Sequence, residues 1–221
     1  MRIKIKKILL DNRWLLIPYV LAFAGCIFVL CFTHKGDTNL AVNALHTHFL
    51  DGFFKFMTGF GTFAYIGPCL LVMCLFSWRI ALTGAVSAGF SSLFTQFCKH
   101  VVWPDSPRPK IHFAEILQDL HLIDGVHLHA SHSFPSGHTT GAFALFCVMA
   151  LFCKRPGWKV FFLLMAVTVA YSRLYLMQHF LIDVTVGSFI GMLAAVLSFW
   201  WLIQYRQSWL DKSALQLFHR K

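Results

Sequence analysis

Three long apolar runs without a charged residue constrain what this chain can fold into. Trp14–Phe32, Phe56–Trp78 and Ile80–Cys98 contain no Asp, Glu, Lys or Arg over 19, 23 and 19 positions. A helix that crosses the hydrocarbon core of a bilayer needs about 20 apolar residues. Only 13% of the 221 residues are charged and 57% are hydrophobic, which is too little charge to cover a water-facing surface. We therefore expect a polytopic helical membrane protein.

Three further apolar runs bring the expected number of spans to six. They cover His138–Cys153, Val160–Gln178 and Phe180–Ile203. After the first span, the amphipathic segment Ala41–Phe60 predicts a short interfacial helix. The expected fold class is all-α, with six transmembrane helices in a single membrane-embedded domain over residues 1–221.

The basic residues predict the orientation of the bundle. A net charge of +10 could indicate a nucleic-acid partner, but the positive residues cluster beside the spans, and 13 of the 19 Lys and Arg residues lie on the side that holds both termini. Cytoplasmic loops are enriched in such residues, so both termini are expected in the cytoplasm. Small size and short termini favour the inner membrane of a bacterium, with Lys99–Pro135 and the junction at His179 on the periplasmic face. We expect no nucleic-acid partner and no obligate protein partner.

The strongest chemical signal lies between the last two spans. His179 and Asp183 are four residues apart, which places them on one face of a helix. A carboxylate beside an imidazole fixes its tautomer and leaves the other ring nitrogen free to act as a nucleophile. By span length, Arg173 lies below the membrane surface, where a charge costs at least ~2.5 kcal/mol, so an anion should meet it. The plainer alternatives are a structural His–Asp pair and an arginine that reaches back to the surface.

The sequence Pro135-Ser136-Gly137-His138 opens the fourth predicted span. Ser136 is suited to cap the helix, and Gly137 allows a ligand to approach the backbone closely. The free N–H groups at a helix start form an anion site. His138 would then face the bound anion as a proton donor, although a solvated residue at a helix start is the plainer interpretation.

Both segments match motifs of a known family. Pro135-Ser136-Gly137-His138 and Ser172-Arg173-x5-His179-x3-Asp183 are full matches, and over about residues 54–203 the chain resembles the type 2 phosphatidic acid phosphatases, which are membrane lipid phosphate phosphatases. Within that family it looks most similar to the bacterial lipid A phosphatases. The family's remaining motif, Lys-x6-Arg-Pro, is represented by Lys99 and Arg108-Pro109 with eight intervening residues instead of six.

The resemblance implies a role for each residue of these motifs. His179 attacks phosphorus and forms a phosphohistidine, Asp183 orients it, and His138 protonates the leaving oxygen and activates water for the second step. The resemblance implies neither a metal nor another cofactor. The phosphoryl oxygens are expected to be held by Lys99, Arg108 and Arg173 together with the backbone of Ser136 and Gly137.

Several alternatives remain open from the sequence. The run "HLHASH", residues 127–132, could bind zinc, but its spacing matches no standard zinc site. A phosphate-binding transporter or scramblase would need the arginines without the nucleophile, and a phosphotransferase would share every motif. The expected substrate is a membrane lipid phosphate. The long loop Lys110–Ser133 favours lipid A over undecaprenyl pyrophosphate or a glycerolipid phosphate, and the resemblance to the lipid A phosphatases implies its 4'-phosphate.

Overall fold

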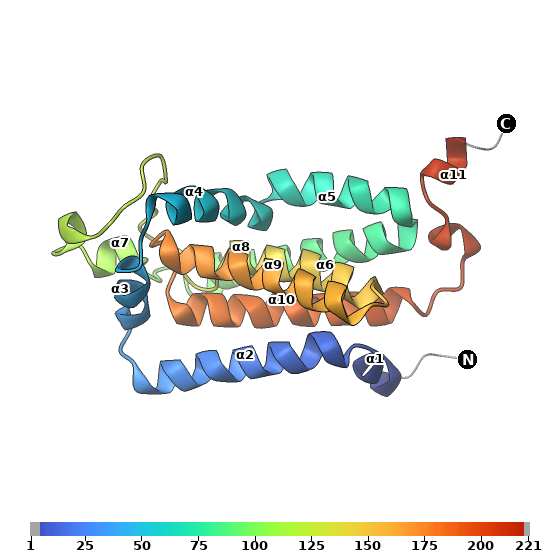
Figure 1. Cartoon of the computed structure of the whole chain (residues 1–221), viewed down its shortest axis with the longest axis horizontal. Coiled ribbons are helices and arrows are strands. Elements are labelled where there is room, and N and C mark those ends of the chain that lie inside the picture. Colours follow the sequence, from blue (N-terminus) through green and yellow to red (C-terminus); the bar gives the residue numbers. More distant parts are fainter. Residues whose placement is uncertain (1–4, 219–221) are drawn as a thin grey trace.

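The structure is a computed structural model that describes residues 5–218, a range that contains helices and loops but no strand. Four of its helical segments are long and apolar enough to cross a membrane. They run side by side along the bundle (Figure 1) and cover α2 (Arg13–Phe32), α6 (Trp78–Phe97) with the π-helical turn η2 (Cys98–Val102), α9 (Pro156–Tyr175) and α10 (Leu181–Leu202). The prediction of an all-α, multi-pass membrane protein is confirmed at this level.

The second apolar run is divided into two helices, where the sequence predicted one helix from Phe56 to Trp78. The run holds the last two residues of α4 (His48–Met57), the 3₁₀ turn η1 (Thr58–Gly61) and α5 (Phe63–Phe76), and the two helices meet at a bend of 65°. Two glycines in the segment Thr58–Thr62 weaken the helix there, because glycine is about 1 kcal/mol less favourable than alanine in a helix interior. Counted as one crossing, the bent pair gives a fifth candidate span.

The segment expected to be one interfacial helix is also divided. Residues 41–60 contain the end of α3 (Asp37–Asn43), a short connection, and then α4. Thr47 separates the two helices: its backbone is extended, and its hydroxyl accepts a hydrogen bond from the N–H of Leu50 at the start of α4. The single interfacial helix is therefore not observed as one element, and α4 instead forms the first half of the bent pair.

The helix α8 (Gly137–Phe152) forms the centre of the bundle. It packs against α6, α9 and α10, and 11 of its 16 side chains are buried. At 1.5 Å per residue it is about 24 Å long, shorter than the ~30 Å core of a bilayer. Gly187 and Gly191 let α10 approach closely, since a Cβ at either position would lie within 2.8 Å of a carbonyl oxygen of α8 or of the residue before it. This contact places the start of α10 beside the start of α8.

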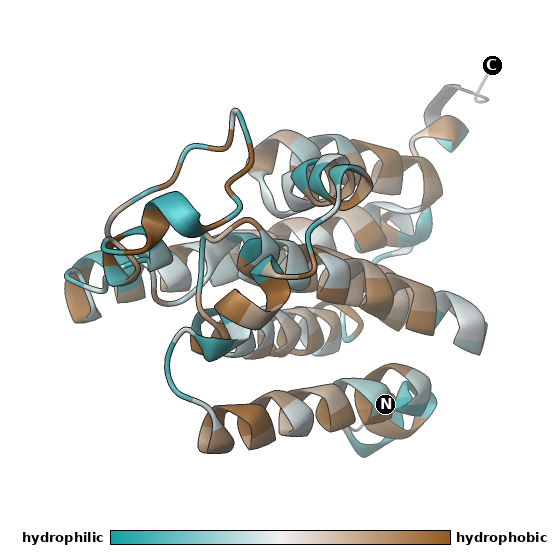
Figure 2. Ribbon diagram, turned by 60° about the vertical axis from the view of Figure 1, so that its left-hand side comes forward, coloured by the Kyte–Doolittle hydropathy of each residue, from teal (hydrophilic) through white to brown (hydrophobic). Residues whose placement is uncertain are grey.

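The outer surface of the bundle is apolar along its length. Figure 2 shows brown, hydrophobic residues over the long helices and teal, hydrophilic residues concentrated in the connecting segments. Large side chains such as Phe32, Phe90 and Leu93 are about three-quarters exposed. Such a surface suits contact with lipid acyl chains rather than with water.

The two ends of the bundle differ in the elements they carry. At one end lie α1 (Ile5–Asp11), η4 (Ser208–Asp211) and α11 (Leu215–Phe218); at the other lie α3, α7 (Pro109–His112) and the long loop with η3 (Leu117–Asp119) (Figure 1). The start of α8 and the junction between α9 and α10 belong to the end with α7. The segments that carry the predicted chemistry therefore meet at one end of the bundle.

Arg79 organises the opposite end. Its side chain is buried at the start of α6, and Nη1 donates hydrogen bonds to the carbonyl oxygens of Leu202 (2.6 Å) and Tyr205 (2.8 Å). Nε and Nη2 bind both carboxylate oxygens of Asp211, at 2.6 and 3.0 Å. A single guanidinium thus satisfies carbonyl groups at the end of α10 and holds the segment that follows.

Arg79→Met should lower the melting temperature of the detergent-purified protein more than Asp211→Asn does. Methionine keeps the aliphatic stem but removes the charged donor from the carbonyl groups of Leu202 and Tyr205, and a hydrogen bond to a charged group contributes about 1.5–3 kcal/mol. The Asp211 side chain is 66% exposed, and an exposed ion pair contributes only about 0–1 kcal/mol. Equal shifts in melting temperature would show that Arg79 stabilises the protein through the Asp211 carboxylate rather than through the carbonyl groups.

Candidate active site

A buried histidine–carboxylate pair lies at the junction of α9 and α10. Nδ1 of His179 is 3.3 Å from Oδ2 of Asp183, and both side chains are almost fully buried. The same oxygen accepts hydrogen bonds from the N–H of Phe180 (2.9 Å) and from the hydroxyl of Ser133. The carboxylate is therefore fixed, it engages Nδ1, and Nε2 is the ring nitrogen left available for chemistry.

Two cationic side chains converge beside Nε2. Nη1 of Arg108 lies 3.4 Å from Nε2 of His179. Lys99 Nζ and Arg108 Nη2 both donate to the carbonyl oxygen of His132, at 2.6 and 3.4 Å. The two extra residues in the first motif therefore do not separate Lys99 from Arg108, because both side chains reach one carbonyl group.

Arg173 lies in the last turn of α9, and its side chain is buried rather than extended to the surface. Nη1 donates to the hydroxyl of Thr58 in η1. Nε is buried and has no acceptor among residues 5–218. The interpretation of Arg173 as a residue that reaches back to the surface is not supported, and its unpaired N–H remains a free donor inside the protein.

The helix break after α4 packs directly against His138. A Cβ at Gly61 would lie 2.5 Å from the carbonyl oxygen of His138 and 2.7 Å from its Cβ, so only glycine fits at this contact. The imidazole of His138 lies within electrostatic range of His179, Arg173, Arg108 and Lys99. The two motif histidines and the three motif cations therefore share one region.

A cavity of about 240 Å³ adjoins His138 between α5, α6 and α8. Its wall combines the apolar side chains of Phe63 and Ile66 with the polar ones of Thr95 and Gln96. The Thr95 hydroxyl is buried and has no hydrogen-bond partner within the described part of the chain. The cavity is thus suited to a group that is partly apolar and carries a hydrogen-bonding atom.

The backbone N–H groups of the Pro-Ser-Gly-His segment differ in whether they are hydrogen-bonded within the protein. The Ser136 hydroxyl caps α8 by accepting from the N–H of Thr139 (3.4 Å), and the Ser136 N–H donates to the carbonyl oxygen of Asp183 (3.0 Å). The backbone N–H of Ser136, expected to hold a phosphoryl oxygen, is therefore engaged within the protein. The next N–H groups, those of Gly137 and His138, have no partner inside the helix because they belong to its first turn.

The environment of His179 favours its neutral form. Burial, followed by the nearby guanidinium groups of Arg173 and Arg108, holds the pKa of His179 well below its usual range. Without a bound anion the imidazole is therefore unprotonated at neutral pH. A nucleophilic histidine needs this state, because only an unprotonated nitrogen has a free electron pair.

Three supporting residues were not identified from the sequence: Ser133, Thr58 and Asn39. Ser133 binds the Asp183 carboxylate and Thr58 binds Arg173. Asn39, on α3, is fully buried, and its Nδ2 donates to the carbonyl oxygen of His179 at 3.0 Å. The Gly-Thr cluster around Thr58 was a detectable sign of a helix break. No local pattern marks Asn39, whose contact spans 140 positions.

The histidine-rich loop does not assemble a metal site. Within residues 5–218 there is no group of three or more His, Cys, Asp or Glu side chains that could hold a metal ion. Within the run, the rings of His127 and His129 contact each other, with centroids 4.9 Å apart. Elsewhere in the loop, His121 binds the Asp51 carboxylate at 3.0 Å, and His112 contacts the carbonyl oxygen of Lys35 at 3.1 Å. The zinc alternative for "HLHASH" therefore has no support in the geometry.

A helical membrane bundle with a buried His–Asp pair among arginine and lysine side chains is typical of a membrane lipid phosphatase. The sequence model of the PAP2 superfamily matches residues 80–207, more than half of the chain, and the chain belongs to this superfamily. The resemblance drawn from the motifs is confirmed, and with it the enzyme class, a lipid phosphatase. This class favours an enzyme over the non-enzymatic alternatives, a transporter or scramblase.

One relative carries the name of a lipid phosphatase. The chain is 28% identical over 162 residues to a lipid A 4'-phosphatase of Bacteroides thetaiotaomicron, covering 70% of this chain and 72% of the relative. A shorter match, 38% over 68 residues, is to the bacitracin transport permease protein BcrC of Bacillus licheniformis, of which it covers 32%.

Two solved structures share the fold. The crystal structure of Aquifex aeolicus LpxE has a TM-score of 0.64 and 25% identity, covering 74% of this chain and 93% of that one. The phosphatidylglycerolphosphate phosphatase of Bacillus subtilis has a TM-score of 0.63 at 21% identity, covering 87% and 98%.

Asn39→Ala should lower kcat by about two- to tenfold while leaving KM nearly unchanged. One hydrogen bond contributes about 0.5–1.5 kcal/mol, and Asn39 holds the backbone of His179 rather than the substrate. Phosphate-release kinetics measure both constants, with Leu40→Ala on the exposed side of α3 as the matched control. A raised KM with unchanged kcat would show that Asn39 does not position the nucleophile.

Proposed function

We propose that this protein removes a phosphate group from a membrane lipid through a phosphohistidine formed on His179. The observation that carries the proposal is the arrangement around this imidazole: Nδ1 faces the Asp183 carboxylate, and Nε2 lies 3.4 Å from Arg108. The free nitrogen of the imidazole therefore faces the cationic groups that would bind a phosphoryl group. Charge stabilisation by such preorganised groups is usually the largest contribution to catalysis.

In the first half-reaction, Nε2 of His179 attacks phosphorus and the P–O bond to the lipid breaks. The leaving oxygen takes a proton from His138, and the phosphoryl group stays on His179 as a phosphoramidate. Arg108, Arg173 and Lys99 neutralise the charge on the phosphoryl oxygens, helped by the N–H of Gly137. Asp183 stabilises the imidazolium that forms, as in other nucleophile–base–carboxylate sites.

In the second half-reaction, water replaces the lipid beside His138. His138, now unprotonated, takes a proton from this water, whose oxygen attacks phosphorus. The P–N bond breaks, inorganic phosphate leaves, and His179 returns to its neutral form. An alcohol in place of water would give phosphotransfer by the same steps.

The cavity beside His138 supports the assignment of the leaving group. A proton donor must lie next to the leaving oxygen, so the lipid attached to that oxygen must fit a space adjoining His138. The cavity between α5, α6 and α8 meets this requirement and offers Thr95 and Gln96 for hydrogen bonds. Its apolar side, at Phe63 and Ile66, faces the neighbouring part of a lipid.

His138→Ala should release a burst of one nitrophenolate per enzyme from p-nitrophenyl phosphate and then nearly stop. This leaving group needs no proton, so His179 is phosphorylated, whereas hydrolysis of the phosphoenzyme still requires His138 as a base. Stopped-flow absorbance measures the burst, and His179→Ala is the control that should show none. Steady turnover without a burst in His138→Ala would assign the second step to another group.

For the substrate, we propose lipid A, with removal of its 4'-phosphate. The supporting observations are the similarity to the Bacteroides thetaiotaomicron lipid A 4'-phosphatase and to the Aquifex aeolicus LpxE structure. The long loop between Lys110 and Ser133 lies at the same end of the bundle as the site and could contact a sugar head group. Undecaprenyl pyrophosphate and glycerolipid phosphates are the alternatives, since the same catalytic residues would serve them.

Deletion of the gene should add one phosphate to lipid A in mass spectra of the whole lipid fraction. The gain should lie at the 4'-position, and expression of the wild-type gene, but not of His179→Ala, should reverse it. Unchanged lipid A together with accumulated undecaprenyl pyrophosphate or glycerolipid phosphate would assign the enzyme to that lipid.

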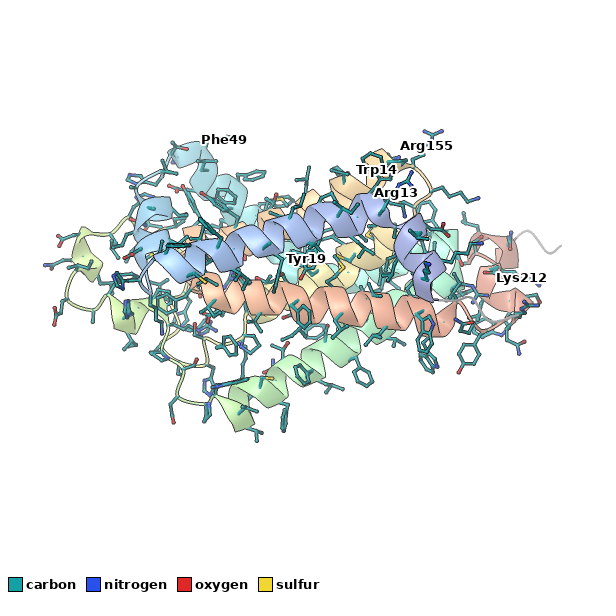
Figure 3. The ribbon with its side chains drawn as sticks, turned by 90° about the horizontal axis from the view of Figure 1, so that it is seen from below. Arg13, Trp14, Tyr19, Phe49, Arg155 and Lys212 are labelled. Carbon is teal, nitrogen blue, oxygen red and sulfur yellow. The ribbon has the colours of Figure 1, made fainter. Side chains whose placement is uncertain are left out.

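We further propose that the bundle crosses the bacterial inner membrane six times with both termini in the cytoplasm. The bent pair α4–α5 would form the second crossing and α8 the fourth, with α3 at the interface and the catalytic end in the periplasm. The support is the basic residues at the end with α1, including Arg13 and Arg155 (Figure 3).

A cysteine at Ser131 should react with an impermeant thiol reagent in intact spheroplasts, and one at Gly157 should not. Both positions are exposed and lie at opposite ends of the bundle. The labelling requires a background in which the seven native cysteines are replaced. Labelling at Gly157 alone would invert the orientation.

A further inference from the structure

A basic cavity, distinct from the one beside His138, lies at the end of the bundle opposite the catalytic residues. It has a volume of about 410 Å³ and is bounded by α1, the turn between α8 and α9, and the end of α10. Three lysines line it, Lys7, Lys154 and Lys159, and they outnumber the single carboxylate there, that of Asp11. The remaining wall is mostly apolar: Ile8, Leu151, Phe152, Phe199 and Ile203.

Lys159 is a buried cationic side chain in the wall of this cavity. Its side chain is 4% exposed, and Nζ donates to the side-chain oxygen of Asn12 and to the carbonyl oxygen of Ala150 (3.1 Å). Both partners are neutral, and an ammonium group has a third N–H to donate. Asp11 lies within electrostatic range of Lys159 but forms no ion pair with it, so an anion in the cavity would further stabilise this buried charge.

Asn12 links the cavity to the N-terminal helix. Its side chain accepts from Lys159 and donates to the carbonyl oxygen of Ile8 at 2.8 Å, at the break between α1 and α2. Leu9 and Leu10 on α1 are exposed, as is Trp14 at the start of α2. Figure 3 shows Trp14 at the same end of the bundle as Arg13 and Arg155, and Phe49 toward the other end. The end of the bundle that holds the basic cavity therefore also exposes apolar side chains on α1 and α2.

From this arrangement we infer a second lipid site, which binds the phosphate of an anionic lipid head group in the leaflet opposite the catalytic residues. The lysines would hold the phosphate oxygens, and the exposed leucines and Trp14 would contact the acyl chains. Basic pockets between membrane helices bind anionic head groups in this way. The site is separate from catalysis, because α8, about 24 Å long, lies between the two ends. An occupied site would fix α1 against the turn between α8 and α9.

Thermal unfolding of the purified protein in a neutral detergent tests the inference. Phosphatidylglycerol should raise the melting temperature, and phosphatidylcholine at the same concentration should not, because a ligand that binds only the folded state stabilises it. Inorganic phosphate forms a third arm that separates a lipid from a free anion. An equal shift with phosphate alone would overturn the assignment to a lipid.

Two matched double variants locate the effect. Lys7→Gln with Lys154→Gln removes two cations from the cavity wall, whereas Lys6→Gln with Arg155→Gln removes the same charge from neighbouring exposed positions outside it. The shift with phosphatidylglycerol should fall by more than half in the first variant and persist in the second. Equal shifts in both would overturn the inference and indicate lipid bound elsewhere, including at the catalytic end.

Lys154→Gln alone keeps the test decisive if the first double variant does not fold. Native mass spectrometry of the wild-type protein then counts the phosphatidylglycerol molecules retained, with Lys154→Gln expected to retain fewer. Equal retention by the two proteins would contradict the inference independently of stability.

Discussion

The hydrogen bonds of Asp183 hold the catalytic end together. Its Oδ2 is bound by His179, Ser133 and the N–H of Phe180, and its carbonyl oxygen accepts from the N–H of Ser136. One residue thereby joins the end of the long loop, the start of α8 and the start of α10. These are the segments that carry the two motif histidines. The same carboxylate that contacts His179, the nucleophile we propose, also closes the fold around it, so its proposed catalytic role and its structural role have one geometric origin.

The cluster of cations near His179 explains why the fold needs the hydrogen bonds of Asp183. Lys99, Arg108 and Arg173 are all buried near one imidazole, an arrangement that is costly without an anion. Backbone carbonyl oxygens of the loop accept from Lys99 and Arg108, while Nε of Arg173 has no acceptor in the described range. A phosphoryl group would supply the missing negative charge. The energy of folding thus maintains a site that is complementary to the charged group of the substrate.

Local patterns predicted part of this arrangement, and tertiary contacts determine the rest. The pairing of His179 with Asp183 follows from helical spacing, and the cap by Ser136 follows from its preference for a helix start. Hydropathy gave no reason to divide Phe56–Trp78, because a broken and a continuous helix can be equally apolar. The position of Lys99 beside Arg108, despite the longer motif, depends on how the loop folds back. Asn39 reaches His179 from a helix far away in sequence, a contact that no single-sequence pattern contains.

The central claim is that His179 carries the phosphoryl group during turnover. Rapid quenching of the working enzyme in alkali, which preserves a P–N bond, followed by tandem mass spectrometry of its peptides tests this most directly. The account predicts one added phosphate on the peptide that contains His179, located on that residue and absent after acid treatment. A phosphate on any other residue would contradict the account. So would the absence of a phosphorylated peptide from the His138→Ala variant, in which the intermediate should accumulate.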